Sequence, residues 1–116
     1  MISKEQAINI ANEYILEKSK RGKHILQLML ERTVEFELGW VFFYQTKDYI
    51  ETGDIGKALI GNAPIIINKK TGEIKVTGTA HHINRYIIQY FQQEEKKLRS
   101  QARDPDQGSL WGDSLK

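Results

Sequence analysis

The run Gly39–Thr46, which reads GWVFFYQT, constrains the fold more than any other stretch of the sequence. Trp40 and Phe42 alternate with Val41 and Phe43, so an extended chain here would present apolar side chains on both faces. A strand of that kind is central in a sheet or is covered on both sides. The rest of the chain must therefore provide neighbouring strands, together with helices or loops that cover them.

Other patterns predict those elements. Ser3 and Gln6 form a capping-box pattern that starts a helix, and apolar residues at three- and four-residue spacing continue it. Alternation with a period of two predicts the strands, and Pro64 suits the start of one because its missing N–H costs little there. The predicted elements are a helix over 3–18, a strand over 25–30, a hairpin arm over 34–38, a strand over 39–46, a hairpin over 64–76 and a helix over 82–98.

This order predicts an α+β fold: an N-terminal helix, an antiparallel sheet of about four strands, and a C-terminal helix packed on the sheet. A chain of 116 residues has the size of one domain, and we expect residues 1–98 to form it. Residues 99–116 lose periodicity and gather Asp, Gly, Ser and Pro, so they are expected to form a flexible tail. In this tail, Trp111 is either part of a docking peptide or part of a disordered end, and the second is favoured.

The composition excludes several classes of protein. The chain has no cysteine, which rules out disulfides, thiol catalysis and cysteine-bound zinc. A formal net charge of +2 is too small to indicate a nucleic-acid partner. No stretch is apolar over the length of a membrane span, and the first residues do not resemble a secretory signal. We therefore expect a cytoplasmic protein that has no membrane partner.

No group of residues forms a recognisable catalytic or metal-binding pattern. The segment TGDIGKAL resembles a phosphate-binding loop, but Glu51 stands where the first glycine is needed and Ala58 where the hydroxyl is needed. His81 and His82 are adjacent and lack carboxylates at ligand spacing, which favours surface histidines over a metal site. We expect a protein that is not an enzyme and holds no cofactor or metal.

The middle of the chain is acidic. Between Glu31 and Asp54 six carboxylates stand against two basic residues, which gives this stretch a charge of −4 and leaves +6 on the remainder. Glu35 and Glu37 are more simply explained as the wet face of a hairpin than as an acid–base pair. The stretch would attract a basic partner, although a solvated face explains the same charges. Its acidic residues are Glu31, Glu35, Glu37, Asp48, Glu51 and Asp54.

A long connection, residues 47–62, follows the aromatic strand and contains three glycines and a predicted helical turn around 57–60. Long ordered loops are usually functional or are tied down by their own side chains. Trp40 and Phe42 are expected in the core rather than in a ligand pocket. Tyr44 and Tyr49 are closer to the acidic loop, and we expect them to face outward.

Three motifs in this part of the chain resemble those of one known family. GWVFFYQTKDYIETGD is followed by GNAPIIINKKTGEI and then by GTAHHINRYIIQYF. In this order they resemble the bacterial immunity protein 35 family, also called the YrhB-like domain. Its hallmarks are a Gly-Trp strand rich in aromatics, a Tyr/Gly-Asp loop, a Gly-Asn-Ala-Pro strand start and a final helix with a Tyr. The resemblance covers roughly 3–91 of the sequence.

The resemblance implies an immunity factor of a polymorphic toxin system. Such a protein is small and cytoplasmic, binds the toxic domain of a secreted protein that is usually encoded by the adjacent gene, and blocks it without catalysis of its own. On this interpretation the motif residues are structural, and GNAP fixes the backbone where the long loop rejoins the sheet. The structural motif residues are Gly39, Trp40, Gly53, Asp54, Gly61, Asn62, Pro64 and Tyr86.

The surface that meets the toxin is a separate hypothesis, based on the acidic stretch. Many toxin domains that act on nucleic acid are basic in the cleft, and acidic residues would steer association with them. The alternative function is a chaperone-like or housekeeping binding domain with broad, weak specificity. The sequence leaves monomer and homodimer open. The residues predicted to contact the toxin are Glu35, Glu37, Tyr44, Asp48, Tyr49, Glu51 and Asp54.

Overall fold

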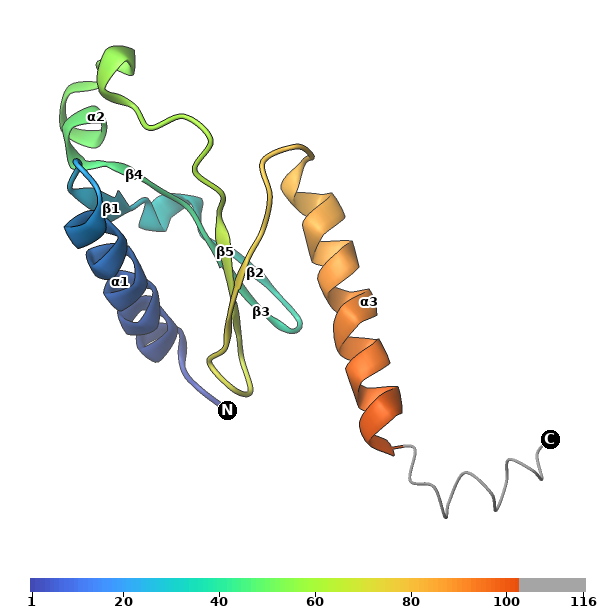
Figure 1. Ribbon diagram of the computed structural model, residues 1–116. Coiled ribbons are helices and arrows are strands. Elements are labelled where there is room, and N and C mark those ends of the chain that lie inside the picture. Colours follow the sequence, from blue (N-terminus) through green and yellow to red (C-terminus); the bar gives the residue numbers. More distant parts are fainter. Residues whose placement is uncertain (103–116) are drawn as a thin grey trace, which may run out of the picture. The chain divides into compact units, whose positions relative to one another are not determined.

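The computed structural model describes residues 1–102 and divides into two compact units, the first formed by Met1–Ala80 and the second beginning at His81. The first unit holds helix α1, all the strands and the short helix α2, and the second holds helix α3 (Figure 1). This is the α+β class that the sequence predicts. The elements are α1 (Lys4–Arg21), β1 (Leu26–Leu28), η1 (Leu30–Arg32), β2 (Val34–Phe36), β3 (Gly39–Phe42), β4 (Tyr44–Thr46), α2 (Lys47–Thr52), η2 (Ile55–Lys57), β5 (Ile65–Asn68), β6 (Ile74–Val76) and α3 (Ile83–Ala102).

Helix α1 begins where the capping-box pattern predicts. The Ser3 Oγ accepts a hydrogen bond from the backbone N–H of Gln6 (3.1 Å), and the Gln6 Oε1 accepts one from the backbone N–H of Ser3 (2.8 Å). Both N–H groups would otherwise lack a partner at the helix start. The helix extends past the predicted end at Lys18 and reaches Arg21. Among the residues that the structure describes, no helix has the length and hydropathy that a membrane crossing requires.

The run 39–46 forms two strands rather than the single strand that the sequence predicts. β3 pairs antiparallel with β2 on one side and with β5 on the other, whereas β4 pairs antiparallel with β1. The partner changes at Phe43, whose carbonyl oxygen accepts a hydrogen bond from the backbone N–H of Met29 (2.8 Å). One extended segment therefore joins a four-stranded sheet, β2-β3-β5-β6, to the two-stranded sheet β1-β4.

The predicted strand over 25–30 is shorter than expected, because the chain turns into η1 after β1. The predicted hairpin arm is strand β2, in which Phe36 lies opposite Gly39. A Cβ atom on Gly39 would lie 2.1 Å from the carbonyl oxygen of Ile67 on β5. Only glycine allows β3 and β5 to approach this closely.

One face of the four-stranded sheet forms the core of the first unit together with α1. Trp40 and Phe42 lie on this face, whereas Val41 and Ile66 occupy alternate positions and are also buried. The apolar character of β3 on both sides thus matches its burial, as the sequence predicts. The buried core residues are Ala7, Ala11 and Ile15 from α1, with Leu28, Trp40, Phe42, Tyr44, Ile65 and Ile67 from the strands.

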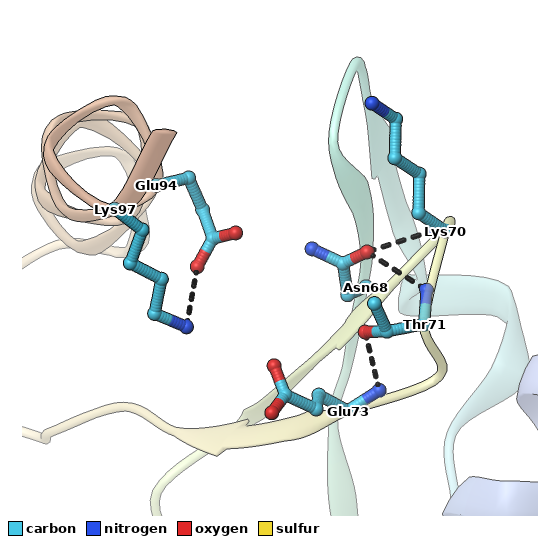
Figure 2. Close-up of polar contacts among 6 residues, drawn as sticks. All are labelled: Asn68, Lys70, Thr71, Glu73, Glu94 and Lys97. Carbon is cyan, nitrogen blue, oxygen red and sulfur yellow. Dashed lines mark hydrogen bonds and ion pairs between the residues drawn. The ribbon is translucent and has the colours of Figure 1, made fainter. Parts of the chain in front are cut away.

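The β5–β6 hairpin is closed by the side chain of Asn68, as Figure 2 shows. Its Oδ1 accepts hydrogen bonds from the backbone N–H groups of Lys70 (2.8 Å) and Thr71 (3.1 Å). The backbone N–H of Glu73 then donates to the Thr71 Oγ1 (3.1 Å). Gly72 has a φ of 76°, a left-handed conformation that residues other than glycine rarely adopt. These contacts explain why NKKTG reverses the chain.

The second unit, where described, consists of a short lead-in and α3. The Tyr86 hydroxyl accepts a hydrogen bond from the backbone N–H of His81 (3.2 Å), which fixes the approach to the helix. On the helix itself, Glu94 and Lys97 form an ion pair with an N–O distance of 3.2 Å (Figure 2). The helix continues to Ala102, beyond the predicted end at Leu98. Trp111 lies outside the described residues.

The long connection contains more regular structure than the sequence predicts. Helix α2 was not expected, and the short helical turn is η2 rather than a turn over 57–60. Gly53 ends α2 with a φ of 72°, a left-handed conformation typical of helix C-termini. The Asp54 carboxylate then caps η2 by accepting from the backbone N–H of Gly56 (2.9 Å).

Candidate functional site

The candidate site is the long connection between β4 and β5, which three consecutive residues of β4 hold in place. The side chain of Gln45 makes three hydrogen bonds. Its Nε2 donates to the carbonyl oxygen of Leu59 (2.9 Å), and its Oε1 accepts from the backbone N–H groups of Leu59 (2.7 Å) and Thr46 (2.8 Å). One side chain therefore satisfies both polar backbone groups of Leu59, in the way that a neighbouring strand would.

Thr46 holds the other side of the connection. Its Oγ1 accepts from the backbone N–H of Tyr49 (3.0 Å), which caps α2, and donates to the carbonyl oxygen of Lys57 (2.8 Å), which fixes η2. Thr46 is 2% exposed, so its hydroxyl is withdrawn from water and these two hydrogen bonds replace hydration.

The GNAP motif completes the attachment. Asn62 donates from its Nδ2 to the backbone carbonyl oxygen of Tyr44, and Gly61 reaches this position with a φ of 80°. The carbonyl oxygen of Pro64 accepts from both the backbone N–H (3.0 Å) and the Oγ1 (2.8 Å) of Thr77. These hydrogen bonds attach the connection to β4 and to the residue that follows β6.

The predicted acidic stretch does not form one continuous surface. Asp48 and Glu51 lie on α2 and Asp54 starts η2, whereas Glu35 and Glu37 lie on β2 and in the turn after it. Figure 1 shows α2 and the β2–β3 turn at opposite ends of the first unit. Asp48, Glu51 and Asp54, here called the loop acids, are exposed and close in sequence, and they form the acidic part of the candidate site.

Glu35 belongs to a different environment. Its Oε2 lies 2.9 Å from the Nζ of Lys69, and this ammonium also lies 5.3 Å from the centroid of the Trp40 ring. The hydrogen bond and the charge of Lys69 lower the pKa of the Glu35 carboxyl. This ion pair spans the sheet from β2 to the residue after β5, which gives Glu35 a structural partner. Glu37 is exposed in the turn.

The expectation that Tyr44 faces outward was wrong. Its side chain is 3% exposed and belongs to the core, because its place on β4 continues the alternation of Trp40 and Phe42. Burial raises the pKa of the Tyr44 phenol, and the neighbouring Tyr14 phenol raises it further. Tyr49 is half-buried and lines a hollow of about 290 Å³ under the connection. Tyr44 therefore belongs to the core, whereas Tyr49 is part of the connection itself and borders this hollow.

A larger open pocket, of about 580 Å³, lies beside the connection. Residues 59–63 form one wall, and the C-terminal end of α1 with residues 22–24 forms the other. Tyr44 and Leu26 also line it. No sequence pattern predicted this pocket, because its walls come from segments far apart in the chain.

The described part of the chain offers no cluster of side chains for a metal ion. Residues 1–102 contain no group of three or more histidines and carboxylates that could hold a metal ion. His81 and His82 are both exposed, as the sequence predicts.

Sequence reasoning missed Gln45 and Thr46, which hold the connection. Thr46 did carry a signal, since Thr46, Asp48 and Gly53 have the spacing of a helix start and its C-terminal cap. Gln45 carried none, because a glutamine in a strand pattern reveals nothing about a partner 14 residues away.

Comparisons with known proteins agree with the motifs. A family model described as Immunity protein 35 matches residues 5–86. A curated relative from Escherichia coli strain K12, described as uncharacterized protein YrhB, is 34% identical over 90 residues, covering 78% of this chain and 89% of the relative. No solved structure matches the chain significantly.

Proposed function

Since this chain belongs to the immunity protein 35 family, we propose that it binds the toxic domain of a cognate secreted bacterial toxin and neutralises it, without catalysis of its own. The family match over residues 5–86 is the observation that carries the proposal. We further propose that the protein acts in the cytoplasm and that the adjacent gene encodes the toxin. The fold supports a binding role, because the connection is a surface segment held rigidly on a sheet.

We propose that the loop acids form part of the contact with the toxin. Glu51 is exposed, and its ion pair with Lys47 has an N–O distance of 3.9 Å and is solvated. Such a pair contributes little to stability and leaves the carboxylate available to a partner. A basic cleft in the toxin would be attracted to these charges and covered by them.

The test measures the affinity of the purified protein for the C-terminal domain encoded by the adjacent gene. The measurement uses isothermal titration calorimetry at two salt concentrations. A loop variant, Glu51→Lys with Asp54→Asn, reverses or removes two of the loop acids, and asparagine keeps an oxygen that can cap η2. We expect the affinity to fall by about tenfold and the salt dependence to weaken, because exposed charges act through long-range attraction.

The control is Glu35→Gln with Glu37→Lys, which changes the net charge equally at the other end of the first unit. Its affinity should stay near that of the unchanged protein. Equal losses in the two variants would show that only net charge matters. An unchanged affinity of the loop variant would remove the loop acids from the contact, and the absence of any complex would refute the immunity function.

A chaperone-like function is the second candidate, and one observation favours it. Ile55 is 81% exposed and Ile60 is 94% exposed, so the connection offers apolar side chains to solvent. A holding protein would bind several unfolded clients weakly, whereas an immunity protein binds one partner at a fixed ratio. Suppression of the aggregation of unrelated heat-denatured proteins would support the chaperone-like function.

A further inference from the structure

Basic side chains gather at the rim of the open pocket of about 580 Å³ beside the connection. Lys18 and Arg21 reach it from the last turns of α1, and Lys23 and His24 from the segment that follows. Among the described residues that line it there is no carboxylate. Lys20, in the same turn of α1, is absent from the lining and pairs with Glu17 at 3.6 Å.

Within residues 1–102, the basic residues at the rim form no ion pair that would explain their position. None of the four forms an ion pair with a residue in the described range 1–102. Basic residues near a helix C-terminus compensate the helix dipole, which accounts for Lys18 and Arg21. It does not account for Lys23 and His24, which lie beyond the helix, or for the lack of a carboxylate among the described residues that line the pocket.

The interior of the pocket is mainly apolar. Leu26, Leu59 and Val76 line it, and the phenol rings of Tyr14 and Tyr44 add aromatic surface with a hydroxyl group on each. An apolar interior below a basic rim fits a ligand that combines a large apolar side chain with negative charge.

We propose that this pocket receives an acidic segment of the toxin domain, in which a large apolar side chain enters the pocket while neighbouring carboxylates meet Lys18, Arg21 and Lys23. This inference rests on the proposed function and adds a second contact to the one made by the loop acids. The two contacts adjoin, because Lys23 and His24 also line a small hollow that contains Asp48. The toxin surface would then carry acidic groups that face the basic rim and, next to them, basic groups that face the loop acids.

A protein segment fits better than a nucleic acid. The phosphate backbone carries one sign of charge along its length and would meet the loop acids as soon as it left the basic rim. A protein surface can alternate acidic and basic groups over the same distance.

The experiment measures the affinity of the full chain for the C-terminal domain encoded by the adjacent gene. Lys18→Glu and Arg21→Glu, made singly, reverse charges at the pocket. Lys20→Glu is the matched control, since it makes the same reversal in the same turn away from the pocket. Ile60→Ser reduces the apolar lining at a residue that is 94% exposed, so folding should not be affected.

We expect Lys18→Glu and Arg21→Glu each to weaken binding by about tenfold, Ile60→Ser by about fivefold, and Lys20→Glu by less than about twofold. Melting temperatures are measured alongside, because all three charge reversals disturb the helix end similarly. A tight complex that tolerates the pocket substitutions as well as it tolerates Lys20→Glu would overturn this inference and leave the immunity function standing. No complex with the unchanged protein would overturn both.

Discussion

Replacing Gln45 by Met tests whether one side chain holds the connection on β4. Methionine has nearly the same length and volume but can neither donate nor accept the same hydrogen bonds. The substitution removes one bond from the Gln45 amide to Leu59 and two bonds that its Oε1 accepts from the backbone of Thr46 and Leu59. The strand pairing of β4 with β1 uses backbone groups and should persist.

The expected magnitude follows from those three hydrogen bonds. Each contributes about 0.5 to 1.5 kcal/mol net, and the groups released are half-buried and would partly hydrate once the connection loosens. We therefore expect a local loss of about 2 kcal/mol. At about 1.4 kcal/mol per factor of ten, this corresponds to roughly thirtyfold faster hydrogen exchange at the backbone amide of Leu59.

The assay is amide hydrogen exchange followed by NMR, with urea denaturation as a measure of global stability. Gln27→Met is the matched control, because Gln27 lies directly opposite Gln45 in the β1–β4 pair and is exposed. It should leave the exchange of Leu59 unchanged. If the Leu59 amide exchanges equally slowly in the Gln45→Met and Gln27→Met variants, other contacts hold the connection and the argument is wrong.

Two further predictions concern the sheet. Gly39→Ala should lower the free energy of unfolding by at least about 1 to 3 kcal/mol, because the Cβ of the alanine would lie 2.1 Å from the carbonyl oxygen of Ile67. A urea denaturation curve that stays unchanged would contradict this prediction. Glu35→Gln should reduce stability near neutral pH, because Lys69 lowers the pKa of the Glu35 carboxyl in the folded state. The stabilisation by the ion pair is present above the pKa of Glu35 in the unfolded chain and is lost as the pH falls through its pKa in the folded protein. The unchanged protein and the Glu35→Gln variant should therefore be equally stable in strong acid. A difference in stability that persisted there would exclude the ion pair as its source.

Much of the fold could be predicted because its signals are local. The capping box at Ser3, the alternation in β3 and β5 and the NKKTG turn each depend on residues close together in the chain. The structural role of GNAP also followed from local chemistry, since glycine supplies a left-handed conformation and Asn62 a backbone hydrogen bond.

The candidate site was predicted less well, for reasons that its residues make clear. Tyr44 was placed outside because it is near the acidic loop in sequence, but its position on β4 turns it into the core. The acidic residues were treated as one surface, yet α2 and the β2–β3 turn carry them to opposite ends of the first unit (Figure 1). The basic pocket was not foreseen, because α1 and residues 59–63 meet only in the folded chain.

The sequence by itself determined the α+β class, most of the helix and strand positions and, through its motifs, the family. Only the tertiary structure decided that the run 39–46 changes partner at Phe43, that Gln45 and Thr46 hold the connection, and that a basic pocket lies next to Asp48. The physical reason is that periodicity and capping are set by neighbours in the chain. Strand partners and pocket walls depend on which distant segments pack together, and no local pattern encodes that choice.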